Sequence, residues 1–229
     1  RFRDELGDWR VILHSPFGKA IHAPWALAIS ERVKATYGFD ANAMAGDDGI
    51  IVRIPATDGE PPSSEIFWFE PEDLRDQLRQ HVGGSALFAA HFRENAARAL
   101  LLPSRNPGKR APLWQQRQRS AQLLDVARQY PTFPIVLETV RECLQDVYDL
   151  PALVELCGNL RERTVRVAEM TTETASPFAS SILFTYTGAF MYEGDSPLAE
   201  KRAAALALDT ALLTQLLGGV ELRALPDRG

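Results

Sequence analysis

The beginning of the fold is decided by residues 9–14, WRVILH, and by the four residues behind them, 15–18, SPFG. The first run is rich in β-branched and aromatic residues, which favour strands, and SPFG has the composition of a tight turn. We therefore expect a hairpin whose second strand is 19–23, KAIHA. Pro24 then suits the first turn of a helix that ends at Gly38, because proline is tolerated there and glycine stops helices.

A second pair of strands is predicted at 42–46 and 49–54, on either side of an acidic DDG turn. The chain then starts with the order β-β-α-β-β, a small antiparallel sheet with one packed helix. An exposed loop follows, because residues 57–64 collect Pro, Gly, Ser and acids. We place a boundary in this loop, between a small β-β-α-β-β unit at 1–56 and a mainly helical unit at 65–229.

Beyond this loop the periodicity is helical. Leu74, Leu78 and Val82 recur at four-residue spacing in a helix that we expect to start near Pro71, and a second helix is expected from Ser85. The second helix places Leu87, Phe88, Phe92, Ala96 and Leu100 on or near one apolar face. Further predicted elements are helices at about 113–129, 134–147, 151–161 and 197–217, a strand at 164–169 and a packed loop at 190–195. The whole chain is expected to be α+β, a small sheet followed by a mainly helical bundle.

Composition describes an ordinary globular chain. Its 229 residues are 45% hydrophobic and carry a net charge of -5, so a sizeable core is expected and no global nucleic-acid signature. Cys143 and Cys157 stand in apolar surroundings without a His or Cys pair nearby, which indicates neither zinc nor a disulfide and favours a reducing, cytoplasmic setting. No apolar run reaches the roughly 20 residues of a membrane span. The first residues have neither an initiator Met nor a signal-peptide pattern, so we expect the chain to be cut from something longer.

The sequence lacks the motifs of several enzyme classes. A phosphate-binding loop ending in Lys-Ser/Thr, a pair of His four residues apart with a Glu, and a Gly-x-Ser-x-Gly elbow are all missing. We therefore assign no catalytic residue and expect no cofactor or metal in this chain.

Basic residues gather between Leu101 and Leu124, where five basic residues and no acidic residue surround Trp114. Such a cluster can follow phosphates, and an aromatic ring can stack on an unpaired base, which is worth about 1–3 kcal/mol per base. The candidate nucleic-acid site is Arg105, Lys109, Arg110, Trp114, Arg117 and Arg119. The alternative is a solvated helix start with Trp114 packed in the core, since tryptophan is usually largely buried.

The turn at 15–19 is a second candidate surface, since it carries an aromatic residue and the cation of Lys19 and lies beside His14 and His22. A plain tight turn is the alternative. An independent hydrolase is a further hypothesis, and it predicts a cleft with perturbed pKa values around His14, His22 or Asp47.

Several long strings of this sequence resemble the DEAD/H-associated region of Lhr-type (large helicase-related) superfamily 2 helicases. They are SPFG at 15–18, HAPWALA at 22–28, DDGI at 47–50, FRENAARALLLP at 92–103, PLWQQR at 112–117, ETVRECLQD at 138–146, SPFASS at 176–181 and FMYEGD at 190–195. The resemblance therefore extends over nearly the whole chain, 1–229.

The resemblance implies an accessory domain of an ATP-dependent, nucleotide-binding hydrolase. Family members use two RecA-like domains and a winged helix, with ATP and Mg, for 3'-to-5' movement on single-stranded DNA and unwinding of DNA or RNA:DNA duplexes, and DNA repair is the expected pathway. The RecA-like and winged-helix modules are absent from this sequence.

The implied role of this chain is to contribute to the channel for single-stranded DNA and to pack against those modules. The alternative is a purely structural brace for the motor without nucleic-acid binding of its own, which predicts an exposed apolar patch.

Overall fold

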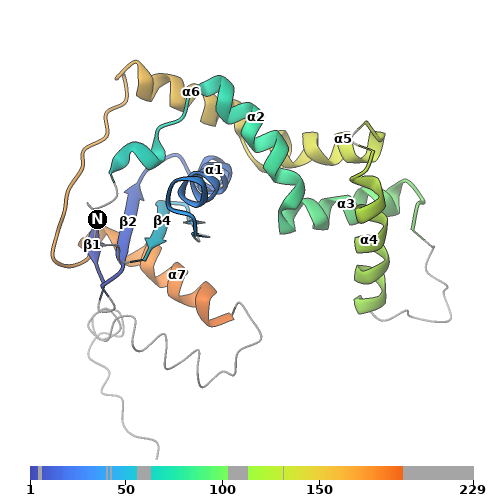
Figure 1. Cartoon of the computed structure of the whole chain (residues 1–229), viewed down its shortest axis with the longest axis horizontal. Coiled ribbons are helices and arrows are strands. Elements are labelled where there is room, and N and C mark those ends of the chain that lie inside the picture. Colours follow the sequence, from blue (N-terminus) through green and yellow to red (C-terminus); the bar gives the residue numbers. More distant parts are fainter. Residues whose placement is uncertain are drawn as a thin grey trace, which may run out of the picture.

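The structure is a computed structural model, and it describes residues 1–4, 7–39, 41, 43–55, 63–102, 113–130 and 132–192. Its described strands form one antiparallel sheet in the order β1-β2-β4-β3 (Figure 1). The strands are β1 (Phe2–Arg3), β2 (Trp9–His14), β3 (Ala43–Ala45) and β4 (Gly49–Ile54). With the helices that follow, this confirms the predicted α+β class.

Helix α1 (Lys19–Tyr37) begins at Lys19, so the predicted strand at 19–23 is wrong. The proline at position 24 lies inside this helix and has no N–H to donate to the carbonyl of Ala20. That carbonyl instead accepts the backbone N–H of Asp149 at 3.0 Å, so a distant segment satisfies the acceptor that proline leaves free. The helix ends at Gly38, as predicted, with φ of 77° and an N–H that donates to the Lys34 carbonyl.

The predicted strand pair around the DDG turn is confirmed, with Ala43 opposite Val52 and β4 paired along its whole length with β2. Gly49 has φ of 150°, and a Cβ there would lie 1.9 Å from the carbonyl oxygen of Leu13. Only glycine fits this close approach of the two strands.

Both faces of the sheet are covered by helices. On one face α1 brings Trp25 and Ile29 against Val11 of β2 in the main core. On the other face α7 (Ser180–Tyr192) places Ile182 against Ile51 in a smaller cluster. The predicted loop at 190–195 is therefore wrong for residues 190–192, which belong to α7, and 193–195 lie outside the described residues. The predicted boundary between units 1–56 and 65–229 stays a prediction.

The helical part agrees with the sequence at most places. Its elements are α2 (Pro71–His81), α3 (Ala86–Arg98), α4 (Leu113–Ala127), α5 (Pro134–Arg141), a π-helical segment (Glu142–Val147) and α6 (Leu150–Arg161), with short 3-10 turns at Ser64–Phe67, Val82–Gly84 and Pro177–Ala179. Ser85 caps α3 by accepting the Phe88 N–H, and Pro71 is in the first turn of α2, as predicted. Leu100 was wrongly placed on the apolar face, because it lies beyond the end of α3 and is 79% exposed.

The predicted strand at 164–169 is also wrong. The N–H groups of Thr164 and Val165 both donate to the Asn159 carbonyl, and the segment then runs on without regular structure. Val165 and Val167 pack against the main core, so their alternation serves packing without a ladder. The predicted helix at 197–217 lies outside the described residues.

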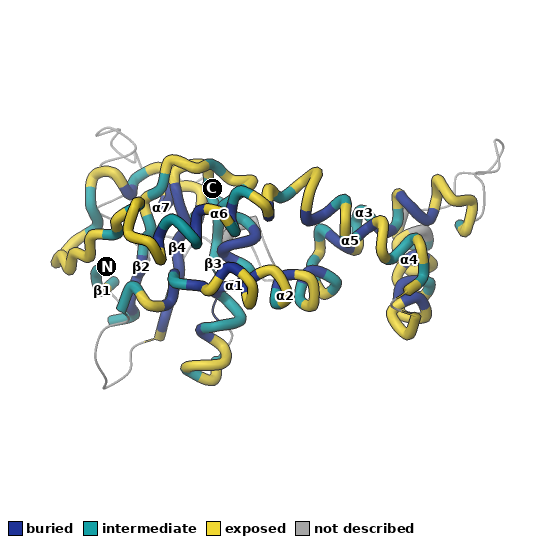
Figure 2. The backbone as a smooth tube through the Cα atoms, turned by 90° about the horizontal axis from the view of Figure 1, so that it is seen from above, coloured by how far each residue is buried: buried dark blue, intermediate teal, exposed yellow. Residues whose placement is uncertain are grey.

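Helices α3, α4 and α5 form an arm that extends away from the sheet, and α2 and α6 connect it to the body (Figures 1 and 2). No helix in the described part of the chain is long and apolar enough to cross a bilayer.

Candidate nucleic-acid interface

Helix α4 carries the described part of the predicted basic site and lies in the arm, far from the sheet (Figure 2). It packs on α3 through one side only, where Ser120, Leu124 and Ala127 are buried. The segment that holds Arg105, Lys109 and Arg110 lies outside the described residues. The arm therefore presents most of the surface of α4 to solvent.

Trp114 is 62% exposed in the first turn of α4, so the alternative that placed this ring in the core is wrong. Arg117 and Arg119 are exposed as well. At about 100° per residue, Arg117 shares the side of Trp114, whereas Arg119 lies across the helix from Arg117. Within the described residues neither guanidinium has an ion pair, so Trp114 and Arg117 together offer a flat ring and a cation on one side of the helix.

Two other basic residues near this segment have structural partners. Arg128 donates a hydrogen bond to the Gly83 carbonyl at 2.8 Å and lies 3.8 Å from Asp125. Arg98 donates to Asn95 Oδ1 at 2.6 Å and to Glu142 at 3.3 Å. These contacts assign Arg128 and Arg98 to the packing of the arm.

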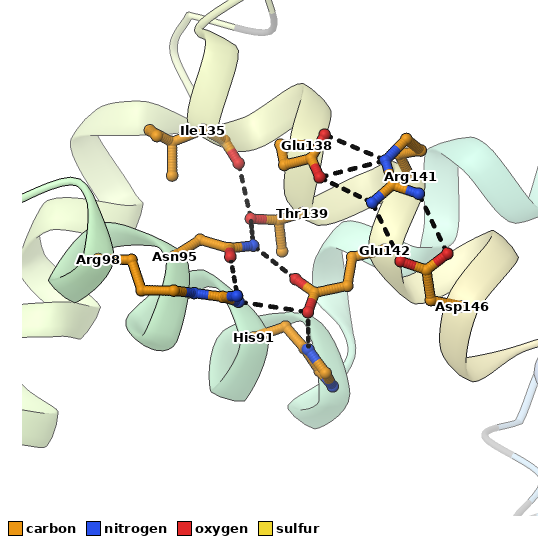
Figure 3. Close-up of polar contacts among 9 residues, drawn as sticks. All are labelled: His91, Asn95, Arg98, Ile135, Glu138, Thr139, Arg141, Glu142 and Asp146. Atoms are coloured by element: carbon orange, nitrogen blue, oxygen red, sulfur yellow. Dashed lines mark hydrogen bonds and ion pairs between the residues drawn. The ribbon is translucent and has the colours of Figure 1, made fainter.

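A polar network joins α3 to α5 and the π-helical segment (Figure 3). The Asn95 amide donates to Thr139 Oγ1 at 3.0 Å and to Glu142 Oε2 at 2.7 Å, and Thr139 donates on to the Ile135 carbonyl. The amide of Asn95, followed by the neighbouring His91, lowers the pKa of Glu142 below its ordinary value. The network thus holds an ionised carboxylate at the helix junction and fixes the base on which α4 rests.

The network was not predicted. Its signal in the sequence is a polar residue at position 95 between Phe92 and Ala96, on the apolar face of α3. A buried amide at such a place requires partners, because an unpaired polar group is costly to bury.

The turn at 15–18 is tied to the turn before β4 by His22. This side chain is fully buried, with Nδ1 2.8 Å from the Gly46 carbonyl oxygen and Nε2 2.8 Å from Ser15 Oγ. The carbonyl can only accept, so Nδ1 donates to it, and Nε2 shares a hydrogen bond with the Ser15 hydroxyl. We assign His22 to the connection of two turns, which favours the plain-turn alternative over a surface that contacts nucleic acid.

The hydrolase hypothesis is met only in part. Burial lowers the pKa of His14. Asp47 lies at the surface near the N–H of Lys19. Among the described residues, no three His, Cys, Asp or Glu side chains gather where a metal ion could bind.

Comparison with known proteins identifies the family. The family model described as DEAD/H associated matches residues 1–179. The chain belongs to the DEAD/H-associated family. It is 64% identical over 227 residues to the "Lhr helicase/ probable uracil glycosylase" of Mycolicibacterium smegmatis, a match that covers 99% of this chain and 15% of that protein. The "Lhr helicase/uracil glycosylase" of Escherichia coli is 59% identical over 221 residues, 96% of this chain and 14% of that protein.

A solved helicase structure is also similar to this chain. It is described as Mycobacterium smegmatis helicase Lhr bound to ssDNA and AMP-PNP, and it matches with a TM-score of 0.74 and 60% identity over 80% of this chain and 23% of that one. The resemblance to Lhr-type helicases is thus confirmed. The chain spans about one seventh of the length of the two bacterial relatives.

Proposed function

We propose that this chain is the accessory domain of an ATP-dependent Lhr-type DNA helicase, where it lines part of the channel for single-stranded DNA and packs against the motor. The likeness to the Lhr structure described as bound to ssDNA carries the proposal, since it extends over most of this chain at high identity. The exposed ring of Trp114 beside Arg117 supplies a surface of the right chemistry, because bases stack on aromatic rings and phosphates bind arginine.

The properties of the longer protein belong to the same proposal. We infer that ATP and Mg bind in RecA-like modules outside this sequence, and that these modules drive 3'-to-5' movement and the unwinding of DNA or RNA:DNA duplexes in the cytoplasm. DNA repair is the pathway that the family resemblance supports.

A packing role is supported by apolar side chains on the arm. Leu101, Val126, Tyr130 and Leu137 are between 43% and 61% exposed, although burial of large apolar side chains is favourable. Such side chains suit a surface that neighbouring modules cover. A domain that only braces the motor, without binding nucleic acid itself, is the second candidate.

Binding of a fluorescent single-stranded DNA oligomer, measured by anisotropy over a salt series, separates the two candidates. We expect weak binding that falls with salt, and loss of binding when Trp114, Arg117 and Arg119 are all changed to alanine. The matched control changes Arg75 and Arg79 of α2, which are also exposed arginines, and should leave Kd close to that of the unchanged protein. Absence of binding by the folded protein at low salt would favour the brace.

A further inference from the structure

A cavity of about 460 Å³ lies between β2 and residues 165–170, a segment termed the strap. The strap runs from α6 toward α7 beside the sheet (Figure 1). One wall of the cavity is residues 11–17, of which 11–14 belong to β2, and the opposite wall is the six consecutive residues of the strap. Because successive side chains of an extended chain point to opposite sides, consecutive lining residues indicate that both backbones border the cavity.

The floor of the cavity is apolar. Trp25 and Phe67 lie beneath it, and α6 contributes Leu156 and Leu160. The cavity is therefore an elongated apolar space between two extended pieces of chain.

The edge of β2 that faces this cavity has no partner strand among the described residues beyond Arg10, because β1 pairs only with Trp9 and Arg10. The Ser15 N–H donates to Asp48 on the β4 side, and hydrogen-bonded pairs alternate along an antiparallel ladder. Val11 and Leu13 therefore direct their backbone groups to β4. Ile12 and His14 direct theirs to the opposite edge, toward the cavity.

The strap side of the cavity is related to β1 by two hydrogen bonds. The ammonium of Arg1 donates to the Met170 carbonyl at 2.8 Å, and the Thr172 N–H donates to the Arg1 carbonyl at 3.0 Å. Bonds from one residue to both neighbours of another are the pattern of parallel strands. The chain at 170–172 thus runs parallel to β1, with β1 lying between it and β2.

The pairing of β1 with β2 can be extended to positions in front of Arg1. Phe2 lies opposite Arg10 and Arg3 opposite Trp9, so a residue joined in front of Arg1 comes opposite Ile12, and the next comes opposite Leu13. This line leads between β2 and the strap, into the cavity.

We propose that the cavity is a strand-binding slot, and that its occupant is an extended stretch of polypeptide leading into Arg1, antiparallel to β2 and parallel to the strap. The inference rests on the proposed function in one respect, since the occupant is a stretch of the longer helicase polypeptide. Such a strand forms hydrogen bonds with the backbone N–H and C=O groups of Ile12 and His14, as in other cases where a peptide adds to a sheet edge. An amide in place of the Arg1 ammonium donates the same hydrogen bond to Met170.

The slot also determines which side chains of the bound strand should be apolar. Leu13 and Val11 belong to the main core, whereas Phe2 and Ile12 contact the cluster under α7. The second residue in front of Arg1 lies opposite Leu13 and faces the apolar floor, so it should be apolar. The first and third face the other side of the sheet.

The test compares three versions of the chain with four residues added before Arg1. Val-Thr-Val-Thr places valine opposite Leu13, Thr-Val-Thr-Val has the same composition in the other register, and Gly-Ser-Gly-Ser has no strand preference. Amide hydrogen exchange is followed by NMR for Ile12 and His14. Val11 and Leu13, whose N–H groups are already bonded to β4, are the internal controls.

We expect Val-Thr-Val-Thr to slow exchange of Ile12 and His14 at least ten-fold relative to Gly-Ser-Gly-Ser, with the two controls unchanged. Equal exchange in these two proteins would overturn the proposal, and equal protection by both valine registers would overturn the assigned side-chain order. Single-stranded DNA binding is measured on the same proteins. Protection of Ile12 and His14 without DNA binding would leave the slot standing while the proposed nucleic-acid role fails.

Discussion

Replacing Asn95 by alanine is expected to weaken the junction between α3 and α5, because this side chain is the centre of the network in Figure 3. The variant loses a hydrogen bond to Thr139 Oγ1 and another to the Glu142 carboxylate. It also loses the bond that Arg98 donates to Asn95 Oδ1, which is left out of the sum because water replaces it at the exposed guanidinium. A neutral bond contributes about 1 kcal/mol and one to a charged group about 1.5–3 kcal/mol. Alanine returns roughly 0.5 kcal/mol through its higher helix propensity. The free energy of unfolding should therefore fall by about 2–3.5 kcal/mol.

Urea unfolding followed by far-UV circular dichroism measures this change. The matched control is Arg98→Ala, which removes a neighbour in the same network whose side chain is 65% exposed. Exposed ion pairs contribute little, so the control should lose less than about 1 kcal/mol. If Asn95→Ala cost no more than Arg98→Ala, the network would not be what holds the arm, and the reasoning would be refuted.

Three further predictions concern other parts of the chain. The pKa of Glu142 is lowered in the folded state, so its contribution to stability is complete above the ordinary carboxyl pKa of about 4.3 and is lost as pH falls below that value. Glu142→Gln should therefore flatten the acid side of a curve of stability against pH. An unchanged curve would show that ionisation of Glu142 does not stabilise the fold. Gly49→Ala should cost at least about 2 kcal/mol in urea unfolding, because its Cβ meets a carbonyl oxygen at 1.9 Å, whereas at Gly46 the nearest contact is 3.9 Å and alanine should be nearly neutral. Burial raises the pKa of Cys143 and of Cys157 to about 11, so both thiols should resist a thiol reagent at pH 8 until the protein unfolds, and rapid labelling of the folded protein would contradict their burial.

Elements with local signals could be predicted from the sequence. Pro71, Ser85 and Gly38 mark helix ends through their own backbone preferences, and each has the expected role in the structure. The segment 19–23 could not be predicted in this way. In its helical form the Ala20 carbonyl has no donor at Pro24, and the N–H of Asp149, more than a hundred residues away, supplies one.

The strap shows the same limit. Its alternation of Val165 and Val167 with polar residues is typical of a strand, but a strand needs a neighbour with free backbone groups at the right distance. In the structure the N–H of Val165, like that of Thr164 before the strap, donates to the Asn159 carbonyl instead.

The candidate site could be predicted as a region but not as a surface. The cluster of basic residues predicts a site on α4, but no local pattern decides whether Trp114 faces the core. Its exposure follows from its place along α4, because the buried Leu124 and Ala127 lie in the last turns of the helix, whereas Trp114 lies in the first turn. The role of Asn95 likewise depends on Glu142, from another helical segment, and was missed.

The most direct test of the account is tryptophan fluorescence during titration with single-stranded DNA. Trp9 and Trp25 are buried and Trp68 is half-buried, so Trp114 is the one tryptophan of the four with a largely exposed ring. If bases stack on α4, DNA should quench the fluorescence of the unchanged protein, and Trp114→Phe should remove most of that quenching while phenylalanine keeps an aromatic ring for binding. Quenching of the same amplitude in Trp114→Phe would contradict a nucleic-acid interface on α4.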